Sequence, residues 1–193
     1  MKNDIVLAGV GGQGILTIAA IIARAAMQAG LHAKQSEVHG MSQRGGSVEA
    51  HLRLSSNPIH SDLIAPGTAD VILAVEPMEA LRQLASLAPD GAVLANANPV
   101  RNIPDYPDTN AILDQLKRRP KAVVLDAEGL ATATAGSARA MNMVMLGAVS
   151  AFLDLPPERL QNAVADMFAR KGQKVVDSNL AAFAAGRDAA LQK

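Results

Sequence analysis

The sequence predicts an α/β protein with a mostly parallel, doubly wound sheet, and three observations support this. Short apolar strands alternate with helical segments, which is typical of a sheet covered by helices on both faces. A glycine-rich turn, residues 9–14, joins the first strand to the first helix. The chain has 193 residues, 49% of them hydrophobic, so one domain over residues 1–193 can bury a sizeable core. Together these features predict a Rossmann-like fold.

The first part of the chain supplies a strand at Asp4–Ala8 and a helix from Ile15 to about Met27. This helix is apolar nearly all round and is therefore expected to be buried on more than one side. A second strand is expected over residues 32–36. Residues 47–54 then alternate between apolar side chains and a polar set, Glu49, His51 and Arg53. The alternation predicts a half-exposed strand that is antiparallel or at an edge of the sheet.

Three fully apolar strands are expected at 71–75, 92–95 and 122–125, and each ends on a polar residue, namely Glu76, Asn96 and Asp126. Helices are expected over 77–88, 109–118, 138–153, 156–172 and 179–191. A strong partner interface is expected to include the apolar 140–153 helix or its surroundings, because both faces of that helix need cover. Glu76 and Asp126 are interpreted as helix caps rather than as ligands of a ribose hydroxyl.

Composition excludes several classes of function. The 18 basic and 18 acidic residues cancel, which argues against a nucleic-acid surface. The chain has no cysteine, so disulfides, thiolate zinc sites and iron–sulfur ligation by this chain are excluded. The histidines show no metal-ligand spacing. The longest apolar stretch, residues 143–153, is too short to span a bilayer, and no signal peptide is recognisable. We therefore expect a cytoplasmic protein without membrane contact.

The glycine turn is the first candidate binding site. Gly9, Gly11 and Gly14 fit the spacing G-x-G-x-x-G after a strand and before a helix. Such a turn allows close approach to the backbone, and the helix start offers free N–H groups to an anion. The candidate cofactor-binding residues here are Gly9, Gly11, Gly12, Gln13 and Gly14. A tight turn without any ligand is the alternative interpretation.

The polar loop over residues 39–46 is the second candidate site. Its predicted binding residues are Ser42, Arg44, Gly45 and Gly46. A guanidinium beside exposed backbone N–H groups suits a phosphate or a carboxylate, although a solvated loop with a surface arginine would look the same. His39 is interpreted as structural rather than as an acid–base group. No residue is assigned a catalytic role, because the sequence shows neither a nucleophile triad nor a P-loop.

These motifs together resemble the gamma domain of 2-oxoacid:ferredoxin oxidoreductases. The similarity rests on the G-x-G-G-Q-G turn at 9–14, the R-G-G loop end at 44–46 and the strand Val48–Arg53. It extends to Glu76-Pro77, Asn96 and the 142–147 helix, and so covers essentially the whole chain. A separately encoded chain of this length resembles the indolepyruvate type within that family.

The resemblance implies a function as a subunit of a heteromeric complex. Such complexes decarboxylate a 2-oxoacid oxidatively and form an acyl-CoA, with coenzyme A as co-substrate and ferredoxin as electron acceptor. Thiamine diphosphate and iron–sulfur clusters are then expected on a larger partner subunit, because this chain lacks cysteine and a G-D-G thiamine motif. The gamma domain is associated with binding coenzyme A and with closing over the active site. The isolated chain would be inactive and could form a homodimer.

Two other functions remain open from the residues. A free-standing NAD(P)-dependent oxidoreductase would use the same glycine turn and needs an acidic residue about 20 positions further on. Glu37 is the nearest candidate, and Lys34 could favour a 2′-phosphate. A nucleotide-sensing module without catalysis is the second alternative.

Overall fold

A six-stranded sheet organises the chain, with the strand order β2-β3-β1-β4-β5-β6. The computed structural model describes residues 1–40 and 45–192. The strands β1, β4, β5 and β6 are parallel, whereas β3 runs antiparallel to both β1 and β2. Their bounds are Lys2–Val10 (β1), His32–His39 (β2), Ser47–Ser55 (β3), Ala69–Ala74 (β4), Leu87–Asn96 (β5) and Ala122–Leu125 (β6). The antiparallel direction predicted for residues 47–54 is confirmed, and the edge position belongs to β2.

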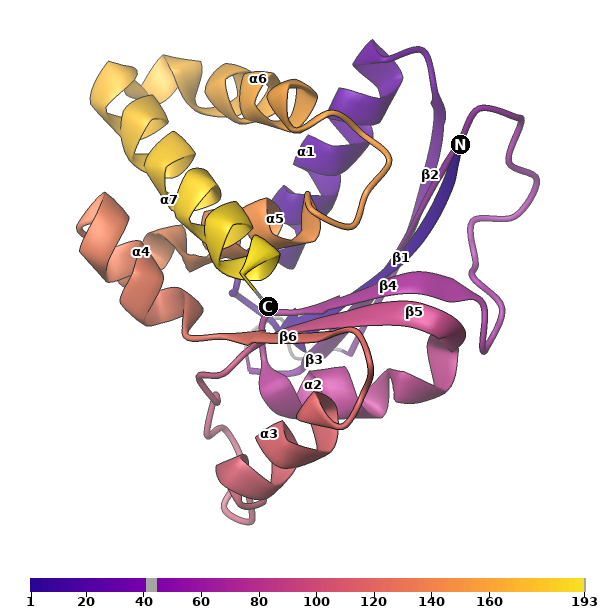
Figure 1. The fold of residues 1–193 in the computed structure, drawn as a ribbon, viewed down its shortest axis with the longest axis vertical. Coiled ribbons are helices and arrows are strands. Elements are labelled where there is room, and N and C mark those ends of the chain that lie inside the picture. Colours follow the sequence, from indigo (N-terminus) through magenta and orange to yellow (C-terminus); the bar gives the residue numbers. More distant parts are fainter. Residues whose placement is uncertain (41–44, 193) are drawn as a thin grey trace.

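Helices cover both faces of the sheet, as a doubly wound fold requires (Figure 1). One face carries α1 (Ile15–Gln28), α4 (Ala127–Ala135), α5 (Met141–Val149), α6 (Pro157–Phe168) and α7 (Gln173–Leu191). The other carries α2 (Pro77–Arg82) and α3 (Thr109–Lys117). Among the described residues, no helix combines the length and the apolar composition that crossing a membrane requires.

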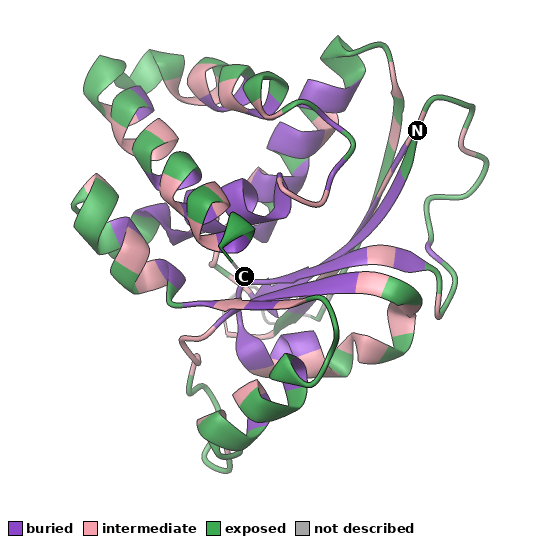
Figure 2. Ribbon diagram, viewed as in Figure 1, coloured by how far each residue is buried: buried purple, intermediate pink, exposed green. Residues whose placement is uncertain are grey.

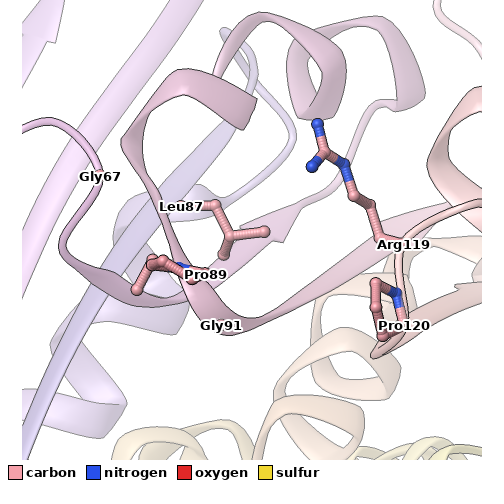
Figure 3. Close-up of a pocket in the computed structure, with 7 residues that line it drawn as sticks. Gly67, Leu87, Pro89, Gly91, Arg119 and Pro120 are labelled. Carbon is pink, nitrogen blue, oxygen red and sulfur yellow. The ribbon is translucent and has the colours of Figure 1, made fainter.

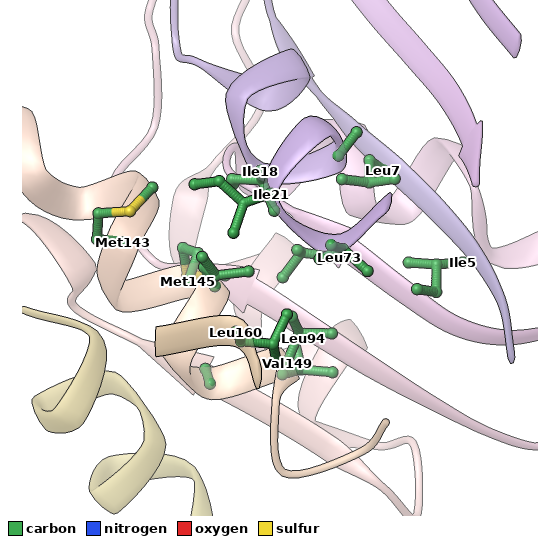
Figure 4. Packing of buried hydrophobic residues seen from close by; sticks show 14 of the residues in the cluster. Ile5, Leu7, Ile18, Ile21, Leu73, Leu94, Met143, Met145, Val149 and Leu160 are labelled. Carbon is green, nitrogen blue, oxygen red and sulfur yellow. The ribbon is translucent and has the colours of Figure 1, made fainter. Parts of the chain in front are cut away.

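Two apolar clusters fill the spaces between the layers. Strands β1 and β4 are buried almost throughout, whereas β2 is largely exposed (Figure 2). The larger cluster includes Met143, Met145 and Val149 of α5, and of these Met145 and Val149 lie toward Leu73 and Leu94 of the sheet (Figure 4). All residues of α5 except Asn142 are buried. The faces of this helix are covered within the chain by α1, α4, α7 and β5. An uncovered apolar face therefore does not support a partner interface here, and that interface stays a prediction.

Helices α5 and α7 cross at two glycines. A Cβ on Gly147 would lie 1.9 Å from the carbonyl oxygen of Phe183, and one on Gly186 would lie 1.9 Å from that of Val144. Any side chain at either position would collide with backbone, so both glycines are required by the close approach of the two helices.

Some predicted boundaries are wrong. Helix α2 ends at Arg82 rather than near 88, because β5 already begins at Leu87 and pairs with β4 through an irregular register. Pro89 and Gly91 lie inside this strand segment and masked it in the sequence. Helix α7 begins at Gln173, not at 179, and the short α4 was not predicted. The helix expected over 138–153 is a 3₁₀ turn, Ala138–Ala140, followed by α5.

The polar face of β3 is also less exposed than its alternation predicts. His51 is buried, since the segment that follows β3 folds over it. The backbone N–H of Ile64 donates to Nδ1 of His51 at 2.8 Å. This places the ring proton on Nε2, which lies 2.7 Å from Oε1 of Glu49. Glu49 in turn accepts a hydrogen bond from Gln83 at the end of α2.

Candidate functional site

The carboxyl ends of β1 and β4 mark the topological switch point of the sheet. Helix α1 leaves β1 toward one face, whereas α2 leaves β4 toward the other (Figure 1). In open α/β sheets, ligands bind in the crevice that such a divergence creates. The glycine turn that follows β1 lies at this position, as the sequence predicted.

The backbone of the turn explains two of its glycines. Gly12 has φ +102° and Gly14 has φ +81°, a region that side-chain-bearing residues rarely adopt. Gly14 is the N-cap of α1, and no side chain caps this helix. A Cβ on Gly14 would lie 2.8 Å from Nδ2 of Asn142, so the N-terminal ends of α1 and α5 approach each other here.

Gln13 has a structural function within the switch point. Its Oε1 accepts a hydrogen bond from the N–H of Val10 at 2.8 Å, and its Nε2 donates to the carbonyl oxygen of Val75 at 3.1 Å. The side-chain amide therefore ties the end of β1 to the end of β4. Gly9 leaves room for this arrangement, because a Cβ there would meet Val75 at 2.4 Å and Gln13 at 3.0 Å.

The second predicted site lies directly against the first. Gly11 N donates to the carbonyl oxygen of Gly46 at 2.8 Å, and Gly45 N donates to that of Gly11 at 3.3 Å. Gly45 has φ +76°. Of the other predicted binding residues, Ser42 and Arg44 lie outside the described residues. The described part of this pair of segments thus forms one continuous glycine-rich backbone surface.

A third segment, residues 97–108, runs over the same place and is called the bridging loop here. Asn102 donates through Nδ2 to the carbonyl oxygen of Gly45. Tyr106 donates its hydroxyl to Oε1 of Glu76, and Val100 N donates to the same oxygen at 3.4 Å. The bridging loop therefore connects the end of β5, the end of β4 and the glycine-rich surface.

The polar residues at the strand ends hold helix starts. Glu76 accepts from the N–H of Glu79 at 2.9 Å and Asp126 from that of Gly129 at 2.9 Å. Both predicted caps are therefore confirmed. Asn96, fully buried, donates to the Val75 carbonyl at 3.2 Å and accepts from Ala127 N at 3.1 Å.

Glu76 is buried, and its carboxylate receives one hydroxyl and two backbone N–H groups. Burial of the phenol raises the pKa of Tyr106, and the hydrogen bond to Glu76 raises it further. Tyr106 is therefore a hydrogen-bond donor at any working pH. This fixes the bridging loop to the end of β4.

The described residues offer no cluster of side chains that would fit a metal ion, and the sequence supplies no cysteine for an iron–sulfur cluster. Within residues 1–40 and 45–192, no three His, Asp or Glu side chains gather closely enough to hold a metal ion. Cysteine, the usual cluster ligand, is missing from the sequence.

The dinucleotide alternative also loses support. Glu37 lies on β2, and β3 separates β2 from β1. At about 4.8 Å per strand, that places it roughly 10 Å from the strand after which the glycine turn follows. The acidic residue of a dinucleotide site instead belongs to the strand beside the first one.

The opposite edge of the sheet holds two shallow cavities. One, of about 220 Å³, is lined by Gly67, Leu87–Pro89, Gly91, Arg119 and Pro120 (Figure 3). The other, of about 320 Å³, lies beside Asp4, Arg53 and His60. Both are remote from the strand ends where the described part of the predicted binding site lies.

The chain is thus an open α/β protein with a doubly wound sheet and a glycine-rich backbone surface at its switch point. The chain matches the family Pyruvate ferredoxin/flavodoxin oxidoreductase over residues 4–189, and it belongs to this family. Among its relatives is the indolepyruvate oxidoreductase subunit IorB of Archaeoglobus fulgidus, 38% identical over 99% of this chain and 96% of the relative. The subunit of the same name from Methanothermobacter thermautotrophicus is 37% identical, with both chains covered in full.

Solved structures share the fold. A 2-oxoglutarate:ferredoxin oxidoreductase from Magnetococcus marinus, with 2-oxoglutarate, coenzyme A and succinyl-CoA bound, is 26% identical with a TM-score of 0.78. The match covers all of this chain and 31% of that one. The gamma subunit of a keto/oxoacid ferredoxin oxidoreductase from Geobacter sulfurreducens matches over 99% of both chains, with 24% identity and a TM-score of 0.73, and shows the shared fold.

Sequence reasoning missed the residues of the bridging loop and the position of Asn142. Three prolines at 99, 104 and 107 indicate only a loop. A polar residue inside an otherwise apolar helix was the available signal for Asn142. Neither signal says that the residue lies against the glycine turn.

Proposed function

We propose that this chain is the gamma-type subunit of a 2-oxoacid:ferredoxin oxidoreductase that acts on indolepyruvate or another aryl pyruvate. The observation that carries this proposal is the full-length similarity to indolepyruvate oxidoreductase subunits at 37–38% identity. Relatives named for pyruvate and ketoisovalerate are 30–32% identical over 83% of the chain, which favours the aryl branch.

The reaction converts one 2-oxoacid, one coenzyme A and two oxidised ferredoxins into an acyl-CoA, carbon dioxide, a proton and two reduced ferredoxins. The bond to the carboxylate breaks, a thioester bond forms, and two electrons leave to ferredoxin. Thiamine diphosphate and iron–sulfur clusters on a larger partner subunit would supply the carbanion and electron chemistry. The absence of cysteine from this chain supports that division of labour.

The contribution of this chain is to bind coenzyme A and to close over the partner's active site. Gly12 and Gly14 leave backbone open at the start of α1, where the helix dipole favours an anion. Gly45 and Gly46 lie against the same turn. Ser42 and Arg44, which lie outside the described residues, remain predicted binding residues of this site, and the charge of Arg44 suits a phosphate.

Reconstitution with the larger subunit tests the proposal. The complex is expected to reduce ferredoxin with indolepyruvate only when coenzyme A is present, and to use pyruvate or 2-oxoglutarate less well. The isolated chain is expected to show neither turnover nor visible absorbance. Turnover by the isolated chain, or a complex indifferent to coenzyme A, would contradict it. Calorimetric binding of NADH in preference to coenzyme A would favour the dinucleotide alternative instead.

A further inference from the structure

The bridging loop crosses the carboxyl ends of the strands at the switch point. It leaves β5 after Asn96, is held at the end of β4 by the contacts of Val100 and Tyr106 with Glu76, and reaches Gly45 through Asn102. Because Gly45 N donates a hydrogen bond to the carbonyl oxygen of Gly11, this part of the loop lies beside the glycine turn. A ligand bound at these strand ends meets the bridging loop at residues 101–102.

Arg101 carries a charge there that no acidic group neutralises. Within the described residues, no carboxylate lies within ion-pairing distance of its guanidinium, which donates one hydrogen bond, to Oγ1 of Thr109 at 3.3 Å. The guanidinium lies 5.7 Å from the centre of the Tyr106 ring, a geometry that stabilises a cation without using its N–H donors. The side chain is exposed, and most of its five donors remain available.

We propose that Arg101 binds a phosphate group of the ligand held at the glycine turn, and that Asn102 and Tyr106 are positioning residues for it. This inference rests on the proposed function, because it assigns a further residue to the coenzyme A site. A guanidinium forms paired hydrogen bonds with phosphate oxygens, and the backbone N–H groups of the turn supply the complementary contacts. Coenzyme A offers two sources of this chemistry, a diphosphate and a 3′-phosphate.

Steady-state kinetics of the reconstituted complex tests the assignment. Arg101→Ala is expected to raise the KM for coenzyme A about tenfold with kcat nearly unchanged, as expected for the loss of one charge-assisted contact to bound ligand. Arg101→Lys keeps the charge but loses the planar guanidinium, so its KM for coenzyme A should lie between those of wild type and Arg101→Ala. The matched control is Arg119→Ala, which removes the same charge from the opposite edge of the sheet and is expected to leave the KM unchanged.

The positioning residues and the phosphate source are tested in the same assay. Asn102→Ala and Tyr106→Phe should raise the KM for coenzyme A about threefold, less than Arg101→Ala, because the arginine remains but is less well held. With dephospho-CoA, wild type and Arg101→Ala should become equal if Arg101 binds the 3′-phosphate. The difference should persist if it binds the diphosphate. Raised ionic strength should reduce the difference in KM for coenzyme A between wild type and Arg101→Ala, because salt screens the charge.

The outcomes separate this inference from the proposed function. An unchanged KM in Arg101→Ala, in a complex that depends on coenzyme A, overturns the inference and leaves the function intact. Equal effects of Arg101→Ala and Arg119→Ala also overturn it, because they indicate a general charge effect. A wild-type complex without coenzyme A dependence overturns both.

Discussion

The two edges of the sheet use buried carboxylates in opposite ways. At the edge where β1 begins, Asp4 is 2% exposed and pairs with two cations, Arg53 and Lys2. At the edge where β4 ends, Glu76 is just as buried, and its donors among the described residues are all neutral. The first arrangement neutralises charge and the second leaves the nearby Arg101 without an acidic partner. One edge is therefore tied together by ion pairs, whereas the other, where the proposed binding site lies, holds its buried carboxylate with neutral hydrogen bonds.

The stabilising edge is densely connected through one arginine. Arg53 contacts both carboxylate oxygens of Asp4, at 2.8 and 3.1 Å. Its remaining nitrogen donates to the carbonyl oxygens of Ser61 and Leu63 at 3.1 and 3.2 Å. One guanidinium thus anchors the segment after β3 to the start of β1.

The largest expected effect is the loss of this anchor. Arg53→Ala leaves a buried carboxylate short of its main partner and is expected to lower the free energy of unfolding by about 3 kcal/mol. Urea denaturation measures it, with Arg119→Ala as an exposed control that should change stability by less than about 0.5 kcal/mol. The KM for coenzyme A should not change in folded Arg53→Ala complex. If Arg53→Ala lowered the free energy of unfolding by less than about 1 kcal/mol, the ion pairs at this edge would not be a major source of stability.

Side chains added to the glycine turn, at the edge of the proposed site, should lower the free energy of unfolding. Gly14→Ala is expected to cost about 2 kcal/mol, because φ is +81° and the new methyl would press on Asn142. Adding Asn142→Ala to Gly14→Ala should restore the share of the unfolding free energy that is lost through the contact with Asn142. Gly12→Ala, with φ +102° but open space around it, should cost only about 1 kcal/mol. If the double variant is no more stable than Gly14→Ala, the contact with Asn142 contributes nothing.

The lone tyrosine reports on the bridging loop. Tyr106 is the one tyrosine of the chain, so phenolate absorbance in a pH titration belongs to it alone. Its pKa is raised by burial and by Glu76, so the folded protein should ionise well above the ordinary value of about 10. The urea-unfolded chain serves as the control and should titrate near 10. A native midpoint near 10 would mean that the loop is not held against Glu76.

The smallest effect concerns acid stability. Burial raises the pKa of Asp4, but Arg53 and Lys2 outweigh it and hold the pKa below its usual value. A lowered pKa in the folded state contributes stability that is present above the unfolded value of about 3.9 and is lost as pH falls below it. Asp4→Asn should therefore flatten the fall in stability below about pH 4. If Asp4→Asn left the dependence of stability on pH unchanged below about pH 4, protonation of Asp4 would not be coupled to unfolding.

Much of the architecture follows from local sequence patterns. The alternation of buried strands with helices determined the fold class, and the spacing of Gly9, Gly11 and Gly14 located the turn between β1 and α1. The caps at Glu76 and Asp126 were also predictable, because a cap is satisfied by a backbone group three residues away. Such features depend on neighbours along the chain, which a sequence displays directly.

The tertiary structure alone decided what lies against the turn. Gln13 looks like a ligand residue in the motif, yet it bonds Val75, 62 positions away. Asn102 reaches Gly45 across 57 positions, and α5 is covered by helices and a strand from distant parts of the chain. The fold class and the position of the candidate site could be predicted from periodicity and from short-range backbone geometry. The contacts that build the site depend on how the layers pack, and no local pattern encodes that.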